Sequence, residues 1–159
     1  MKITKSSISD LEAIKSITAK TINCVYPRYY PRDAVDFFLN HHSEKSIITD
    51  IESGSVYLCF DLKNNAVGTV TIKANEICRL FVLPEHQGKG YGRALLEFAE
   101  KRIAESYDSI LIDASLPAKA IYLKRGYSST EFHSIKTENG DYLCYDVMIK
   151  RCGRKKKLD

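Results

Sequence analysis

Three glycines within five residues mark the most informative segment of the chain, Gln87-Gly88-Lys89-Gly90-Tyr91-Gly92. Glycine allows a tight turn and leaves no Cβ between the backbone and a ligand. A helical pattern starts directly after this loop, and the first N–H groups of a helix lack partners and lie at the positive end of its dipole. The segment therefore predicts an anion site suited to a pyrophosphate, with Lys89 and Arg93 adding positive charge at its rim.

Two common phosphate-binding loops do not fit this segment. A Walker loop needs a glycine five residues before Gly88 and Ser or Thr after Lys89, where the chain has Leu83 and Gly90. A dinucleotide fingerprint that starts at Gly88 needs a third glycine where the chain has Arg93. The pattern that remains is Gln-x-x-Gly-x-Gly between a strand and a helix.

The elements that must position this loop follow from the hydrophobic periodicity. Helices are expected from a capping box of Ser9 and Glu12 to about Ile22, from residue 32 or 33, over 44–52, from the loop to about residue 105, and over 118–124, with Gly126 closing the last. Strands are expected near Ile3 and over 55–61, 66–73, 76–83, 109–114, 127–133 and 142–149. This order predicts one α/β domain, residues 1–150, with a mixed central sheet of about seven strands flanked by helices.

Two segments of the chain resemble the motifs of the GNAT superfamily of acyl-CoA-dependent N-acetyltransferases. The first, Ile77–Leu96, is similar to the acetyl-CoA motif almost residue for residue. The second, Ser115–Tyr127, resembles the later cofactor and catalytic motif. The hairpin before them and the strand pair after them are in family order, whereas residues 1–55 match only in pattern. The resemblance implies a GNAT-like sandwich and an acyltransferase that uses acetyl-CoA as co-substrate and no metal.

The resemblance also implies which residues bind the cofactor. The backbone of Leu80, Phe81 and Val82 would pair with the pantetheine arm and polarise the thioester carbonyl. The pyrophosphate would be held by backbone N–H groups with help from Arg93, and those groups belong to Gln87, Gly88, Lys89, Gly90, Tyr91 and Gly92. Ser115 is a further cofactor-binding candidate, although the family often has Asn there and a hydroxyl reaches less far than an amide.

Transfer to an amine needs a base, an oxyanion donor and an acid. A lysine-like amine has a pKa near ~10 and must lose a proton before it attacks. Glu76 is the candidate base, acting directly or through a water, because it precedes Gln87 by eleven residues as in many family members. Tyr122 is the candidate acid because it occupies the family's position, four residues before Gly126. The alternatives are an exposed carboxylate at a strand start and a tyrosine packed on the sheet.

The acceptor pocket is expected to draw on residues 24–42 and on the loop 133–141. Its candidate lining residues are Tyr26, Tyr29, Tyr30 and His133, and His133 is also a second candidate for the base. Tyrosines next to prolines are equally often packing residues. The acceptor is expected to be a primary amine on a small molecule, a peptide or a protein, and the sequence does not distinguish among these.

Charge distribution and composition argue against nucleic-acid-binding, membrane and secreted proteins. The net charge of +4 comes from the basic tail, residues 151–159, because the 150 residues before it carry 19 basic and 19 acidic side chains. A balanced body argues against a nucleic-acid-binding face. No run reaches the ~18 apolar residues of a membrane span, the first residues lack a signal-peptide pattern, and the five cysteines form no C-x-x-C pair. We therefore expect a cytoplasmic enzyme, with a homodimer as an alternative to a monomer and an acyl-CoA-sensing module as the alternative function.

Overall fold

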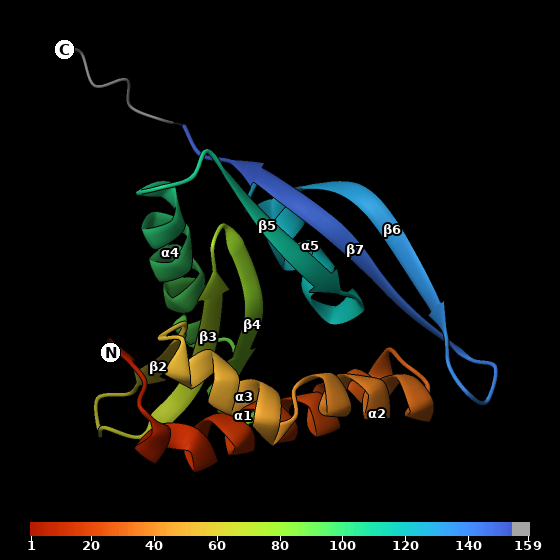
Figure 1. Ribbon diagram of the computed structural model, residues 1–159, viewed down its shortest axis with the longest axis horizontal. Helices are drawn as coiled ribbons and strands as arrows, with labels where there is room; N and C mark the ends of the chain where they lie inside the picture. Colours follow the sequence, from red (N-terminus) through yellow and green to blue (C-terminus); the bar gives the residue numbers. More distant parts are fainter. Residues whose placement is uncertain (154–159) are drawn as a thin grey trace.

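A seven-stranded mixed sheet in the order β1-β2-β3-β4-β5-β7-β6 forms the centre of the computed structural model, which describes residues 1–153 (Figure 1). All neighbouring strands are antiparallel except β4 and β5, which are parallel. The strands are β1 (Lys2–Lys5), β2 (Val56–Phe60), β3 (Ala66–Lys73), β4 (Glu76–Val82), β5 (Ser109–Ser115), β6 (Ser128–Lys136) and β7 (Tyr142–Arg151). The predicted single α/β domain with a mixed sheet of seven strands is confirmed.

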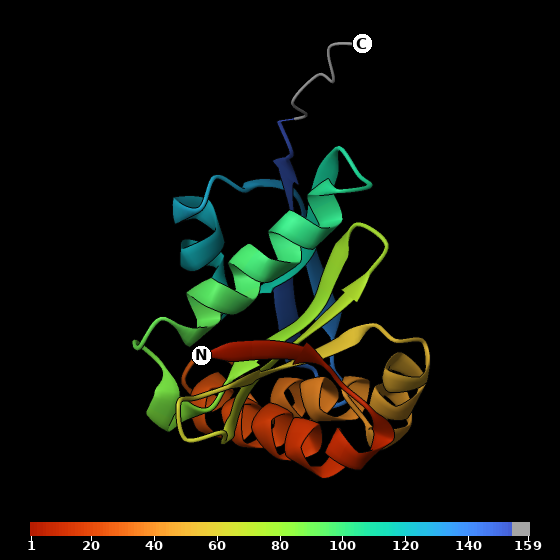
Figure 2. The same cartoon turned by 90° about the vertical axis from the view of Figure 1, so that its left-hand side faces the viewer.

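Five α-helices and three short 3-10 helices in the described chain surround this sheet. They are η1 (Ile8–Asp10), α1 (Leu11–Val25), η2 (Tyr26–Arg28), α2 (Arg32–His41), α3 (Glu44–Glu52), η3 (Pro84–His86), α4 (Tyr91–Ala104) and α5 (Leu116–Lys124). In both views α1, α2 and α3 lie together, and α4 packs on the sheet apart from them, in a different hydrophobic core (Figures 1 and 2). None of the helices in residues 1–153 is long and apolar enough to cross a membrane.

Two hydrophobic cores lie on the two faces of the sheet. One core joins α4 to side chains such as Ile110 and Ile112, and the other joins α1, α2 and α3 to side chains such as Phe81. Because side chains of a strand alternate between faces, Asp113 and Ser115 of β5 lie on the α1 face, opposite Ile112. The polar residues of β5 are thereby directed to one side of the sheet.

Strands β4 and β5 separate soon after they meet. They pair only at Glu76–Leu111 and Ile77–Ile112, although β4 continues to Val82 and β5 to Ser115. Between β3 and β4 the register shifts by one residue, so that Cys78 is an extra residue on β4. Such a bulge bends its strand. The far half of β4 therefore has no partner on the β5 side.

The start of α1 differs from the expectation. The predicted capping box of Ser9 and Glu12 is wrong, because η1 precedes α1 and moves the cap two residues earlier, to Ser7 with Asp10. The Asp10 carboxylate accepts a hydrogen bond from the Ser7 N–H at 2.8 Å, and the Ser9 hydroxyl contacts the Ser7 hydroxyl.

Other boundaries also differ from the expectation, among them the end of β6, which is Lys136 and not residue 133. Helix α5 begins at Leu116 and not at residue 118, because Pro117 is tolerated in a first turn where its missing N–H has no role. Strand β7 extends through Arg151, and the Cys152 N–H donates to the Asp108 carbonyl at 2.8 Å. The expected basic tail thus begins within the sheet, and residues 154–159 lie outside the described residues.

Candidate active site

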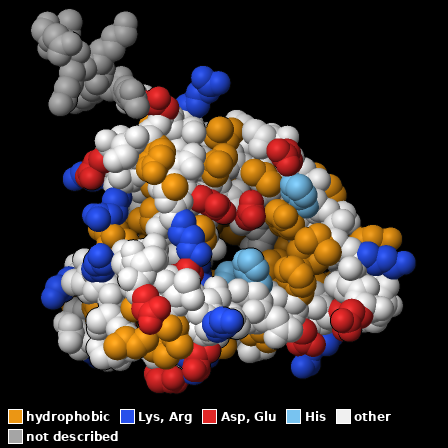
Figure 3. Space-filling view, viewed as in Figure 1, with side chains coloured by type: hydrophobic (Ala, Val, Ile, Leu, Met, Phe, Trp, Pro, Cys, Tyr) orange, Lys and Arg blue, Asp and Glu red, His pale blue; other side chains and the backbone are white. Residues whose placement is uncertain are grey.

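A cavity of about 1020 Å³ lies where β4 and β5 separate. Its walls come from β4, β5, the loop before α4, the start of α4, α5, and the segment from the end of α1 to α2, with Lys73 of β3 and a few residues of β6 and β7. Figure 3 shows a hollow near the middle of one face, with acidic side chains on one rim and histidine and hydrophobic side chains beside it. One opening therefore joins the glycine-rich loop to polar groups on the α1 face of the sheet.

The glycine-rich loop forms one end of this cavity. Gly88 and Gly90 have φ angles of 73° and 89°, which favour glycine, and a Cβ at either position would meet no heavy atom within 4 Å. Gly90 is the N-cap of α4, and the first bond of the helix runs from the Ala94 N–H to the Gly90 carbonyl. The Gln87 side chain donates to the Val82 carbonyl at 3.0 Å, which ties the loop to β4. The N–H groups of the first helical turn are left free for an anion.

Positive charge gathers at this end of the cavity. Arg93, Lys124 and Arg125 are among the lining residues. Arg93 is held by Glu97 at 3.0 Å, and Arg125 by Glu100 at 2.8 Å and by Glu97 at 3.4 Å. Arg93 belongs to the first turn of α4, where a phosphate would benefit from its charge.

Two carboxylates lie at the other end. Glu76 begins β4 and is paired with Leu111, so Asp113 is the next residue of β5 on the same face. Burial and the nearby charge of Asp113 raise the pKa of Glu76, whereas Lys73 and His41 lower it. Burial also raises the pKa of Asp113, against the lowering effect of His133. Within residues 1–153 neither side chain has a hydrogen bond or an ion pair, so both are available to a ligand.

Tyr122 lines the cavity from α5. Its side chain is buried, and its ring packs against Tyr127 with centroids 5.6 Å apart. Burial raises the pKa of Tyr122, and the neighbouring Tyr26 acts in the same direction. Its hydroxyl has no hydrogen-bond partner in the described chain. Tyr122 is therefore a protonated hydroxyl at neutral pH that can donate to a group in the cavity.

Ser115 and Tyr26 line the cavity but satisfy each other. The Tyr26 hydroxyl donates to the Ser115 hydroxyl at 3.2 Å. The Tyr26 ring also packs edge-on against Phe38, with centroids 4.8 Å apart. Ser115 is the N-cap of α5 and makes no capping bond with its side chain. The serine that replaces the family's usual Asn is thus engaged with the α1 side of the molecule.

The other acceptor candidates lie outside the cavity lining. Tyr30 is buried; its hydroxyl donates to the Cys144 carbonyl at 2.9 Å and accepts from the Leu116 N–H at 2.7 Å. Tyr29 is exposed. His133, on β6, stacks on Tyr145 at 5.0 Å and contacts Glu131 at 3.0 Å.

The structure therefore gathers most of the predicted residues around one cavity. Those that line it are Glu76, Leu80, Phe81, Val82, Gln87, Gly88, Gly90, Gly92, Arg93, Ser115, Tyr122 and Tyr26. Lys89 and Tyr91 do not line it, and the Lys89 amino group instead donates to the Glu85 carbonyl at 2.7 Å.

Asp113 and Arg79 are polar groups of the cavity that sequence reasoning missed. Asp113 is the only charged residue of strand β5, which is a signal that the sequence does offer. His42 lies in the expected acceptor segment, and burial lowers its pKa to about 3, so its imidazole is neutral. The position of Arg79, which also lines the cavity, depends on a partner in α3 and left no local signal.

The chain belongs to the GNAT family, because the family model described as an acetyltransferase (GNAT) domain matches residues 26–141. Members of this family use acetyl-CoA, and the protein is an acyltransferase enzyme. A comparison of the sequence with curated proteins found no match.

Solved structures share the fold at low sequence identity. A GCN5-related N-acetyltransferase from Rhodopseudomonas palustris has a TM-score of 0.85 at 21% identity and covers 95% of each chain. The PaiA N-acetyltransferase of Thermoplasma acidophilum, in complex with coenzyme A, has a TM-score of 0.72 at 21% identity, over 95% of this chain and 98% of that one. The ribosomal-protein-S18-alanine N-acetyltransferase of Escherichia coli has a TM-score of 0.70 at 16% identity, over 99% and 97%.

Proposed function

We propose that the protein transfers an acetyl group from acetyl-CoA to a primary amine by direct attack. The observation that carries the proposal is that one cavity joins three groups: the free N–H groups that begin α4, the unpartnered hydroxyl of Tyr122 and the unpartnered carboxylate of Glu76. These are the phosphate site, acid and base that acetyl transfer to nitrogen requires.

The residues at the glycine-rich end fit coenzyme A. Open space at Gly88 and Gly90 lets a diphosphate approach the backbone, and Arg93 adds charge beside it. The backbone of Leu80–Val82, on the half of β4 without a β5 partner, is suited to pair with the pantetheine arm. Acetyl-CoA, as co-substrate, supplies an acetyl group activated as a thioester.

Glu76 acts as the base, directly or through a water. The acceptor amine arrives as an ammonium, and the carboxylates of Glu76 and Asp113 attract that charge. Glu76 then takes a proton from the nitrogen, which frees its lone pair for the carbonyl carbon. The raised pKa of Glu76 makes it a better proton acceptor than an ordinary glutamate.

Tyr122 acts as the acid. As the new C–N bond forms and the C–S bond breaks, the sulfur leaves with a negative charge. The Tyr122 hydroxyl donates its proton, or a hydrogen bond, to that sulfur, and the second proton of the acylated nitrogen passes to the Tyr122 oxygen or to solvent. Because its raised pKa keeps the hydroxyl protonated, this role is available throughout the neutral range.

The test is a thiol-release assay with acetyl-CoA and a panel of polyamines, amino acids, aminoglycosides and peptides. We expect turnover above background hydrolysis with at least one amine and an acetylated product by mass spectrometry. Calorimetric binding of coenzyme A without any acetylated product would overturn the proposal in favour of a non-catalytic acyl-CoA-sensing module.

A further inference from the structure

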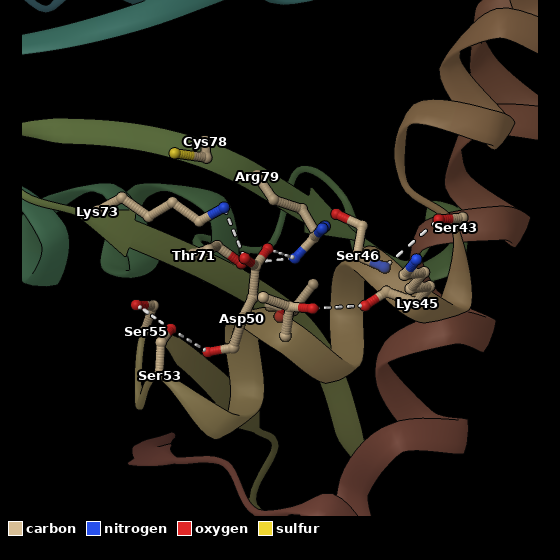
Figure 4. A network of polar contacts seen from close by, with 12 residues as sticks. Ser43, Lys45, Ser46, Asp50, Ser53, Ser55, Thr71, Lys73, Cys78 and Arg79 are labelled. Atoms are coloured by element: carbon tan, nitrogen blue, oxygen red, sulfur yellow. Dashed lines mark hydrogen bonds and ion pairs between the residues drawn. The ribbon is translucent and has the colours of Figure 1, made fainter.

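An ionic cluster lies at the acceptor end of the cavity, and two of its members, Lys73 and Arg79, line the cavity (Figure 4). Asp50, in α3, contacts the Lys73 amino group through one carboxylate oxygen at 2.5 Å and the Arg79 guanidinium through the other at 3.1 Å. The same Arg79 nitrogen donates to the Thr71 hydroxyl at 2.8 Å. The Asp50 and Arg79 side chains are 3% and 2% exposed, whereas that of Lys73 is 49% exposed. Lys73 is therefore the one member of this trio with freedom to move.

Lys73 has a second potential partner in Glu76. The two residues are opposite each other in the β3–β4 register, where opposite charges usually interact across the strands. They also share a face of the sheet, because Lys73 reaches α3 and Glu76 faces the acceptor end of the cavity. Nevertheless Lys73 forms its ion pair with Asp50, and none with Glu76 within the described chain. Figure 4 shows the Lys73 amino group directed toward Asp50.

We propose that Asp50 is a positioning residue that draws Lys73 away from Glu76 and so leaves the Glu76 carboxylate free to accept the proton of the amine. The inference rests on the proposed role of Glu76 as base. Asp50 itself is not among the residues that line the cavity, and it acts through Lys73.

The charged groups around Glu76 determine whether a movement of Lys73 raises or lowers the pKa of Glu76. Asp113 of β5 raises the pKa of Glu76, and Lys73 of β3 and His41 of α2 lower it; the Cys78 thiol of β4 is its remaining titratable neighbour. A Lys73 that moved closer would lower this pKa further. A carboxylate with a lower pKa is a weaker base, so release of Lys73 would reduce catalysis.

The deciding variant is Lys73→Gln, a change at a half-exposed side chain that removes the charge and leaves Asp50 with Arg79. We expect the acid limb of the kcat/KM profile to move upward by about 0.5 pH unit, the scale of a partly screened charge some ångströms away. Lys45→Gln, which removes an exposed charge from α3, should leave the profile unchanged. A limb that moved upward by more than about 1 pH unit in Lys73→Gln, the scale of a direct ion pair, would show that Lys73 already pairs with Glu76 and would overturn the inference.

The reverse variant is Asp50→Asn. It frees Lys73 to pair with Glu76, so the acid limb should move to lower pH and the plateau of kcat/KM should fall about 3-fold. The double variant Asp50→Asn with Lys73→Gln should restore the plateau. Because Asp50→Asn also leaves the Arg79 charge without its partner, which is strongly destabilising, Lys73→Gln decides the matter if this variant does not fold.

A readout that does not depend on catalysis separates this inference from the proposed function. Carbon-13 NMR titration of the Glu76 carboxyl should give a higher pKa in Lys73→Gln than in the parent protein. If that shift is found but no amine is acetylated, the proposed function fails and the positioning of Lys73 stands. If amines are acetylated but the Glu76 pKa rises by more than about 1 unit, as the loss of a direct ion pair would cause, the inference fails alone.

Discussion

The two ends of the cavity are built in different ways. At the glycine-rich end the ligand-facing groups are main-chain N–H groups, and they come from one contiguous segment, Gln87–Gly92. At the acceptor end they are side chains, and Glu76, Asp113 and His41 come from three separate elements. A site made of backbone depends on local conformation and tolerates most side-chain changes except at its glycines. A site made of side chains depends on tertiary packing and can change its acceptor one residue at a time.

The largest expected effect is at the acceptor end. Glu76→Gln removes the proposed base, and we expect kcat/KM at neutral pH to fall about 10²–10³-fold, as is typical for the loss of a general base. The matched control is Glu105→Gln, an exposed carboxylate that follows α4 and lies outside the cavity lining. A loss below about 3-fold would remove Glu76 from the base role.

The next largest effect is expected at Tyr122, which lines the cavity between the glycine-rich end and the acceptor end. Tyr122→Phe deletes the donor to the leaving sulfur, and we expect kcat to fall about 10-fold or more while the affinity for acetyl-CoA stays near its original value. Tyr57→Phe is the control, because Tyr57 is equally buried and lies outside the cavity lining. Steady-state kinetics with both substrates varied would measure this, and an unchanged kcat would exclude Tyr122 as the acid.

A smaller effect is expected at the glycine-rich end. Gly90→Ala places a Cβ at a φ of 89°, which costs roughly 1–2 kcal/mol unless the loop changes conformation. We expect the KM for acetyl-CoA to rise about 5-fold with kcat nearly unchanged, because the phosphate-binding N–H groups move. Gly140→Ala imposes similar strain at a φ of 93° in the β6–β7 loop, and it should lower stability without changing this KM. Equal effects of both variants on KM would contradict a backbone phosphate site.

The smallest effect tests whether the two carboxylates act together. Asp113 raises the pKa of Glu76, so Asp113→Asn should lower that pKa and move the acid limb of kcat/KM to lower pH by less than one unit. The KM for the amine should rise about 3-fold, because one of two attracting charges is lost. Asp141→Asn, in the β6–β7 loop, should change neither quantity. A limb that stayed at its original pH would show that the two charges are not coupled.

The same contrast explains how much could be predicted from the sequence. The fold class and the family follow from strand, glycine and helix signals that are local, and both are confirmed. The separation of β4 from β5 depends on the extra residue Cys78, which alters the β3–β4 register and has no sequence signature of its own. The roles of Tyr30 and Arg79 depend on partners 114 and 29 residues away in the chain, which periodicity does not reveal.

Tyr30 links distant parts of the molecule through a single oxygen atom. The Tyr30 hydroxyl donates to the Cys144 carbonyl of β7 and accepts from the Leu116 N–H at the start of α5. The nearby Tyr26 hydroxyl donates to the Ser115 hydroxyl. The chain between α1 and α2 is therefore connected by hydrogen bonds to the start of α5, the helix that carries Tyr122. An acceptor that displaced this segment would have to break these hydrogen bonds to the start of that helix.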